Sequence, residues 1–172
     1  LRAFSYDRTL NERKLPGIYD VDGLGLNYRM SELQAALGQN QLERADSFLQ
    51  SRAKNFMEYK ERLFDTEILQ ILEPKDLRAQ NAFYCLTLKL REGGEKLRNQ
   101  ILEQLPARGV GVSVHYPHPL PRLAYYQDKY GYQAGNYSNA EAISDTTFNL
   151  PLGPHLQKGD IEYVCENLVS LF

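Results

Sequence analysis

Long hydrophobic runs are absent from this sequence of 172 residues, and no apolar stretch approaches the roughly 18 residues that a membrane-spanning helix requires. A strong excess of charge is also absent, since 20 lysines and arginines stand against 22 aspartates and glutamates. No basic run carries interleaved aromatic residues, which argues against a dedicated nucleic-acid binder. The composition is that of an ordinary globular domain, so we expect a cytoplasmic protein without membrane or nucleic-acid partners.

Cysteine is scarce, and its placement excludes two kinds of site. Cys85 and Cys165 lie far apart with apolar neighbours, which predicts buried thiols rather than a disulfide or a metal pair. His115 and His118 have a spacing that metal ligands can use, but a third ligand is missing. The surrounding prolines also favour an extended backbone that separates the two rings. We therefore predict no metal site.

Residues 31–64 are rich in helix formers and contain no proline. Ser31 suits the N-cap because its hydroxyl can accept from an unpaired backbone N–H, and Gln34 can reach back to the N–H of Ser31. At 1.5 Å per residue, about 34 residues would span roughly 50 Å, which exceeds the diameter of a small domain. Such an element is a connector, an oligomer interface or two helices. We predict two helices that meet near Asp46 and Ser47.

The rest of the chain alternates short β-prone runs with amphipathic helices. The predicted strands are residues 67–72, 82–90 and 110–116, with a brief extended segment at 147–152. The predicted helices are residues 95–105, 138–144 and 158–171, with a further short helix inside the tyrosine-rich stretch 125–137. This order favours a small, mainly antiparallel sheet with helices on one face, an α+β fold.

Three parts follow from these patterns. Residues 1–30 form an arm and a loop, residues 31–64 a connecting helix pair, and residues 65–172 a small α+β domain.

Asn27 and Arg29 lie just before the predicted helix, where an anion would be favoured. A helix N-terminus carries positive partial charge and unpaired N–H donors. An amide and a guanidinium on the approaching loop suit a phosphate, because both donate hydrogen bonds to oxygen. The structural alternative is a left-handed turn at Asn27 and an ion pair between Arg29 and a nearby carboxylate.

His115 and Tyr116 lie at the end of a predicted strand, followed by a proline-rich loop. A histidine can exchange a proton near neutral pH, and a tyrosine offers a phenolic donor to a phosphate or a sugar hydroxyl. The alternative is that His115 is a structural donor at a strand end, a common role for histidine.

The run GLNYRMSELQAALG at residues 25–38, followed by QLER at 41–44, closely resembles the DegT/DnrJ/EryC1/StrS family. Members of this family are aminotransferases that use pyridoxal phosphate (PLP) to aminate keto sugars carried on nucleotides. The resemblance covers nearly all of this chain but only the C-terminal part of the family's length. It implies the small C-terminal domain of a fold-type I PLP enzyme, entered through a long helix. The chain begins at Leu1 rather than at methionine, and we expect it to be a fragment.

The resemblance also implies roles for particular residues. Asn27 resembles the amide that reaches across a homodimer interface to the PLP phosphate of the other subunit. Arg29, His115 and Tyr116 resemble residues on the nucleotide-sugar side of the neighbouring pocket. The family pattern continues with a second histidine, but Pro121 stands at that position here, which leaves the contribution of that histidine in doubt.

A reactive lysine is the group that the sequence lacks. Transamination with PLP needs an amine that bonds to the cofactor and later moves a proton. The lysines present are in polar surface contexts or on exposed helix faces, and none lies in a motif that resembles the Schiff-base site. We therefore expect no catalytic residue in this chain, an inactive fragment, and an intact aminotransferase that uses a donor such as glutamate. The alternatives are a PLP-dependent sugar dehydratase and a non-catalytic dimerisation module.

Overall fold

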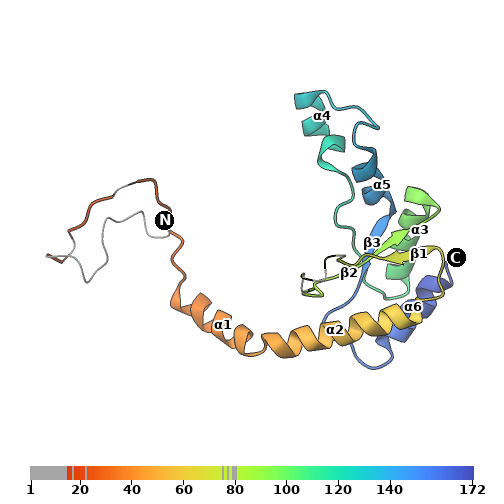
Figure 1. Ribbon diagram of the computed structural model, residues 1–172, viewed down its shortest axis with the longest axis horizontal. Coiled ribbons are helices and arrows are strands. Elements are labelled where there is room, and N and C mark those ends of the chain that lie inside the picture. Colours follow the sequence, from red (N-terminus) through yellow and green to blue (C-terminus); the bar gives the residue numbers. More distant parts are fainter. Residues whose placement is uncertain (1–14, 17, 22, 75, 77, 79–80) are drawn as a thin grey trace. The chain divides into compact units, whose positions relative to one another are not determined.

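The computed structural model describes residues 15, 16, 18–21, 23–74, 76, 78 and 81–172 (Figure 1). Most of the predicted N-terminal arm, at residues 1–14, 17 and 22, lies outside these described residues. Two compact units are present, Leu1–Ala45 and Asp46–Phe172. The three parts expected from the sequence stay a prediction.

Helix α1, Glu32–Glu43, begins with the capping box that the sequence predicts. The backbone N–H of Gln34 donates to Ser31 Oγ at 3.3 Å, and the backbone N–H of Ser31 donates to Gln34 Oε1 at 2.9 Å. The helix ends at its C-cap residue Arg44, and α2, Ala45–Arg62, begins at the next residue. Two helices are therefore confirmed, with their junction slightly earlier than Asp46 and Ser47.

The second unit contains a three-stranded antiparallel sheet in the order β1-β2-β3. Its strands are β1, Leu69–Ile71; β2, Leu86–Leu90; and β3, Thr147–Leu150. In the register of the sheet, Leu69 pairs with Leu90, and Thr87 pairs with Asn149. The antiparallel sheet predicted from the sequence is confirmed.

Two strand predictions need correction. The predicted strand at residues 82–90 is shorter, because Phe83 has a φ of +49° and its N–H donates to Asn81 Oδ1 at 2.8 Å. This local turn keeps residues 82–85 out of the ladder. Residues 110–116 are not a regular strand, since only Ser113 pairs, through a single antiparallel bridge to Asn149. The alternating valines pack against the core without forming a ladder.

The core lies on one face of the sheet and is closed by helices. Leu86, Leu88 and Leu90 are buried, whereas Thr87 and Lys89 between them are half-buried. The same cluster receives buried side chains from three helices: Phe56 and Tyr59 of α2, Ile101 and Leu105 of α3 (Gly94–Ala107), and Ile161, Val164 and Leu168 of α6 (Asp160–Val169). This arrangement confirms the predicted α+β fold.

Helix α3 runs two residues beyond its predicted end, so that Pro106 lies within its last turn. Gly109, at a φ of +77°, then ends the helix. The N–H of Gly109 donates to the carbonyl of Pro106, and the N–H of Val110 donates to the carbonyl of Leu105, both at 3.0 Å. These two bonds form a Schellman motif, which requires a left-handed residue.

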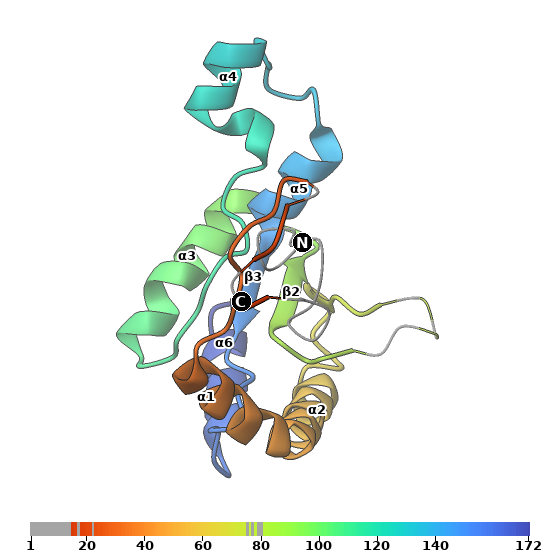
Figure 2. The same ribbon diagram turned by 90° about the vertical axis from the view of Figure 1, so that its left-hand side faces the viewer.

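An excursion from the sheet occupies residues 120–137. It contains the 3₁₀ helix η2, Leu120–Arg122, and α4, Ala124–Tyr130, and returns through α5, Ser138–Thr146. Figures 1 and 2 show α4 at the far end of the excursion and α5 nearer to the sheet. Its tyrosine rings contact one another in sequence, with Tyr126 stacked on Tyr130 and Tyr132 edge-on to Tyr137. The predicted short helix is confirmed, although it begins at Ala124.

Candidate functional site

In the first unit, Asn27 and Arg29 form one hydrogen-bonded pair. Asn27 Oδ1 accepts from the backbone N–H of Arg29 at 3.3 Å and from Arg29 Nε at 3.1 Å. Both residues are exposed, and Asn27 does not have the positive φ that a left-handed turn would give it. The left-handed turn considered from the sequence is therefore wrong.

This pairing determines which atoms of Asn27 can bind a ligand. Its carbonyl oxygen is occupied by Arg29, so the Asn27 amide group turns its Nδ2 donors away from that pair. The loop ends at Ser31, where the capping box uses the N–H of Gln34. An exposed amide donor beside a guanidinium can donate hydrogen bonds to an anionic group such as a phosphate, because phosphate oxygens accept hydrogen bonds and carry negative charge.

In the second unit, His115 and Tyr116 are adjacent and both exposed. Their ring centroids lie 5.9 Å apart with the planes inclined by 45°. The segment that carries them is fixed two residues earlier, where Ser113 and Asn149 exchange backbone hydrogen bonds of 3.2 and 2.7 Å. Asn27 and Arg29 thus belong to the first unit of the chain, and His115 and Tyr116 belong to the second. Their roles in binding stay predictions.

His115 opens onto a solvent-accessible cavity of about 380 Å³ beside the β3 edge. Its wall combines thiol, hydroxyl, amide and imidazole groups with apolar surface, a mixture that can hold a polar ligand in one orientation. The lining residues are Tyr84, Cys85, Gly111, Val112, Ser113, His115, Asn149, Leu150, Pro151 and Leu152. Tyr116 is not among them, and its side chain is exposed.

Asn149 is a polar residue of this wall that the sequence did not single out. Its exposed fraction is 3%, yet its side chain is hydrogen-bonded at both ends. Oδ1 accepts from Thr87 Oγ1 at 2.6 Å, and Nδ2 donates to the carbonyl of Ser113 at 3.3 Å. The only sequence signal is an asparagine inside an apolar extended segment, where an amide needs partners because burial would otherwise leave it unsatisfied.

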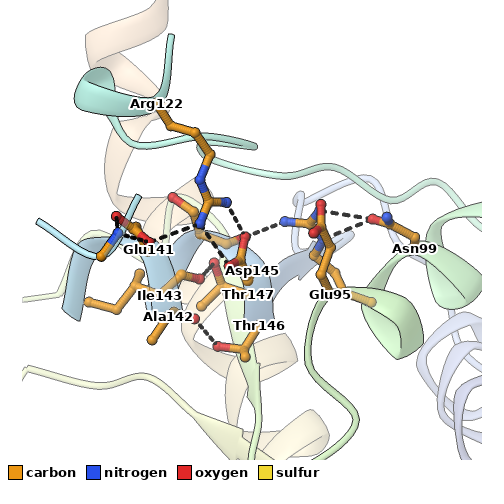
Figure 3. Close-up of polar contacts among 12 residues, drawn as sticks. Glu95, Asn99, Arg122, Glu141, Ala142, Ile143, Asp145, Thr146 and Thr147 are labelled. Carbon is orange, nitrogen blue, oxygen red and sulfur yellow. Dashed lines mark hydrogen bonds and ion pairs between the residues drawn. The ribbon is translucent and has the colours of Figure 1, made fainter. Parts of the chain in front are cut away.

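A second unforeseen group lies around Asp145 (Figure 3). Arg122 Nη1 donates to Asp145 Oδ1 at 2.5 Å and Arg122 Nη2 donates to Asp145 Oδ2 at 3.0 Å. Arg122 Nη2 also lies 3.4 Å from Glu141 Oε2. These bonds from Arg122, with the positive charges of Arg98 and His118 nearby, hold the pKa of Asp145 below its ordinary value.

Buried Arg98 supports the same region from α3. It donates to the backbone carbonyl of Ser144, to Asn99 Oδ1 and to Glu95 Oε1. A guanidinium that is 3% exposed would be unfavourable without such partners. Arg98 therefore holds the end of α5 against α3, where the next residue, Asp145, pairs with Arg122.

The two cysteines agree with the sequence prediction in part. Both thiols are free; Cys165 is buried, which raises its pKa to about 11, and Cys85 is only half-buried.

Among the described residues, no three histidine, cysteine or acidic side chains gather as a metal site. Within the same residues, no helix combines the length and the apolar character needed to cross a membrane.

The described lysines lie outside the lining of the cavity beside His115. They are exposed apart from half-buried Lys89. Lys60 pairs with Glu73 at 2.9 Å, and Lys129 lies over the rings of Tyr125 and Tyr130. Lys14 and Lys75 lie outside the described residues.

The sequence matches the model of the DegT/DnrJ/EryC1/StrS aminotransferase family over residues 2–169. The chain belongs to this family. Among curated relatives of this DegT-family chain, GDP-perosamine synthase from Escherichia coli O157:H7 is 30% identical over 155 residues, which cover 90% of this chain and 40% of the relative. The spore coat polysaccharide biosynthesis protein SpsC from Bacillus subtilis (strain 168) is 30% identical over 151 residues, covering 86% and 38%.

The fold of the DegT-family chain also has solved counterparts. The PMP form of the putative sugar aminotransferase Spr1654 from Streptococcus pneumoniae superimposes with a TM-score of 0.86 at 24% identity, covering 99% of this chain and 43% of that one. The chain thus spans about two fifths of the length of the relatives and structures that it matches.

Proposed function

We propose that this chain is part of a PLP-dependent aminotransferase that aminates a keto sugar carried on a nucleotide. The observation that carries the proposal is the family match, which extends over nearly the whole chain. The named relatives support the substrate class, since one is a GDP-perosamine synthase and another is a UDP-4-amino-4,6-dideoxy-N-acetyl-beta-L-altrosamine transaminase. When bound, PLP supplies the electron sink that amino transfer requires.

In this proposal, Asn27 holds the PLP phosphate through its Nδ2 donors. Arg29 orients the Asn27 amide by occupying Oδ1, and the Arg29 guanidinium adds positive charge on the side of the nucleotide sugar. His115 and Tyr116 offer an imidazole and a phenol for binding a nucleotide sugar. A nucleotide sugar carries phosphates and several hydroxyls, and all four side chains can donate hydrogen bonds to oxygen.

We further propose a homodimer in which Asn27 reaches the PLP of the partner subunit. The surface of α1 supports this arrangement. No residue of α1 is buried, and its side chains Leu33 and Leu42 are 85% and 76% exposed. Burial of exposed leucines against another protein surface would gain free energy, because apolar surface would be removed from water. A partner surface over α1 is therefore favoured.

The covalent step is assigned to a lysine outside these 172 residues. No described lysine lines the cavity beside His115, which supports this assignment, because a covalent step needs an amine at the site of reaction. The role of the chain itself is to bind the phosphate and the substrate. The amino group would come from a donor such as glutamate.

The test uses the full-length protein with PLP, glutamate labelled with heavy nitrogen, and GDP- and UDP-linked keto sugars. Transfer of the label to the sugar, detected by mass spectrometry, is the expected result. No transfer to any sugar of the set would overturn the proposal. Loss of a sugar hydroxyl without nitrogen transfer would instead indicate the dehydratase considered from the sequence.

A further inference from the structure

The segment that carries His115 and Tyr116 is tied at both ends to the junction of α5 and β3. Residues 113–122, here called the His115 loop, begin at the bridge between Ser113 and Asn149. They end at Arg122, which forms its two-point ion pair with Asp145 (Figure 3). Asp145 and Asn149 are four positions apart, so one short stretch of chain fixes both ends of the loop.

Asn149 makes the more specific of these two connections, because its side chain links three segments of the chain, namely β2, β3 and the start of the His115 loop. Thr87 is its register partner on β2 and donates to its Oδ1, while Nδ2 donates to the carbonyl of Ser113. The Asn149 amide is therefore oriented by the sheet and in turn holds the first residue of the loop. The Oδ1 and Nδ2 atoms of Asn149 are not interchangeable, since the Thr87 hydroxyl donates a hydrogen bond and the Ser113 carbonyl accepts one.

The cavity wall shows what this connection determines. Asn149, Ser113 and His115 line the same cavity of about 380 Å³. His115 follows Ser113 by two residues, so a shift of Ser113 moves the imidazole along the wall. Small displacements of groups that bind substrate reduce rate or affinity strongly, because productive geometry tolerates little misplacement.

We propose that Asn149 is a positioning residue that sets the location of His115 and Tyr116 for binding the nucleotide sugar. This inference rests on the proposed function. Asn149 acts through Thr87 and Ser113 and not by chemistry on the substrate. By holding the loop before substrate arrives, it removes part of the ordering cost from binding.

Two substitutions in the full-length protein separate the ends of the amide. Asn149→Asp keeps an acceptor for Thr87 but replaces the Nδ2 donor by an oxygen that faces the Ser113 carbonyl. Thr87→Val keeps the volume of the side chain and removes the donor to Oδ1, together with the 3.5 Å contact between Thr87 Oγ1 and Cys85 Sγ. Asn139→Asp is the matched control, because it makes the same change from amide to acid at an exposed position of α5.

We expect Asn149→Asp to raise the KM for the nucleotide sugar about tenfold with kcat within about twofold of wild type, because pre-organised binding is lost and the chemical step is kept. Thr87→Val should move KM in the same direction by a smaller factor, and Asn139→Asp should leave both constants unchanged. Unchanged KM in a folded Asn149→Asp protein would overturn the proposal. If Asn149→Asp does not fold, Thr87→Val serves as the test, and an unchanged KM in folded Thr87→Val would overturn the proposal.

Amide exchange provides a readout that does not depend on activity. The Ser113 N–H should exchange at least about tenfold faster in Asn149→Asp than in wild type, while the N–H of Leu88 in β2 keeps its protection. If the wild-type protein aminates no nucleotide sugar, the proposed function fails. The anchoring of the loop is then decided by this exchange alone, and an unchanged Ser113 rate would overturn it.

Discussion

Arg122 and Asp145 form a parallel, two-point ion pair, with Nη1–Oδ1 and Nη2–Oδ2 distances of 2.5 and 3.0 Å. The two side chains are 28% and 24% exposed, so water screens the pair only in part. The pair joins η2 to the last turn of α5 across 23 positions of sequence. It is thus a long-range contact that stabilises the base of the α4 excursion.

We predict that Asp145→Asn lowers the free energy of unfolding by about 1 to 2 kcal/mol at pH 7, because Arg122 loses its charged partner while both groups stay partly hydrated. Asp145 has a lowered pKa when folded. Its stabilisation is therefore complete above the unfolded pKa of about 3.9 and is lost as the pH falls through the lower folded value. Urea unfolding of wild type and variant at several pH values measures the difference.

Asp128→Asn, at an exposed position of α4, is the matched control and should change stability by less than about 0.5 kcal/mol. A difference between wild type and Asp145→Asn that stays constant from pH 7 to pH 2 would contradict the role of the ion pair.

Tyr59 gives a prediction of the opposite sign. Its ring is fully buried, and its hydroxyl has no hydrogen-bond partner among the described residues. Tyr59→Phe should therefore raise the free energy of unfolding by about 1 kcal/mol, because a buried, unsatisfied hydroxyl is removed. Tyr163→Phe is the control, since the Tyr163 hydroxyl donates to the carbonyl of Arg108 at 2.9 Å, and its loss should destabilise the protein. Equal destabilisation by both changes would show that Tyr59 has a partner.

Alkaline unfolding tests the same residue independently. Burial raises the pKa of Tyr59 above its ordinary value of 10. Above that pH the unfolded phenol ionises while the folded one keeps its proton, so wild-type stability should fall as the pH rises. Tyr59→Phe should show a shallower decline.

Ser31→Ala removes one half of the capping box of α1. We expect a cost of about 1 kcal/mol to the first turn of the helix, which corresponds to roughly fivefold faster exchange of the Gln34 N–H. Ser31→Thr keeps the hydroxyl and should keep most of the protection. Equal exchange in wild type and Ser31→Ala would mean that the box contributes nothing to α1.

Asn27→Ala in the full-length protein should weaken PLP retention about tenfold, the effect of losing one hydrogen bond to a charged phosphate, while the melting temperature stays unchanged. Dialysis followed by absorbance of the retained cofactor measures this. The exposed Asn139→Ala is the control. Undiminished cofactor affinity in Asn27→Ala would remove the phosphate role of this amide.

The parts that the sequence predicts well are those in which cause and effect are close along the chain. Ser31 and Gln34 are three residues apart, and their capping box forms as expected. The prediction of a strand at residues 110–116 is wrong, because alternating valines indicate that one side of the segment is buried. They do not indicate that its backbone pairs with another strand. Its only ladder contact depends on Asn149, a residue 36 positions away.

The candidate site divides in the same manner. Asn27 with Arg29, and His115 with Tyr116, are sequence neighbours whose resemblance to a family marks them. Thr87 and Asn149 are 62 positions apart, and Arg122 and Asp145 are 23 apart. Such pairs arise only when the antiparallel register and the packing of α3 bring them together. No local pattern in a single sequence specifies those contacts.

Glu141 has a consequence of its own, since it accepts from the backbone N–H of Gly135 at 2.9 Å as well as contacting Arg122. One carboxylate thereby joins the outgoing and the returning chain. Residues 123–134 are closed off at their root, and insertions or exchanges within them need not strain the sheet. Natural variation in the length and composition of this region is therefore compatible with an unaltered core.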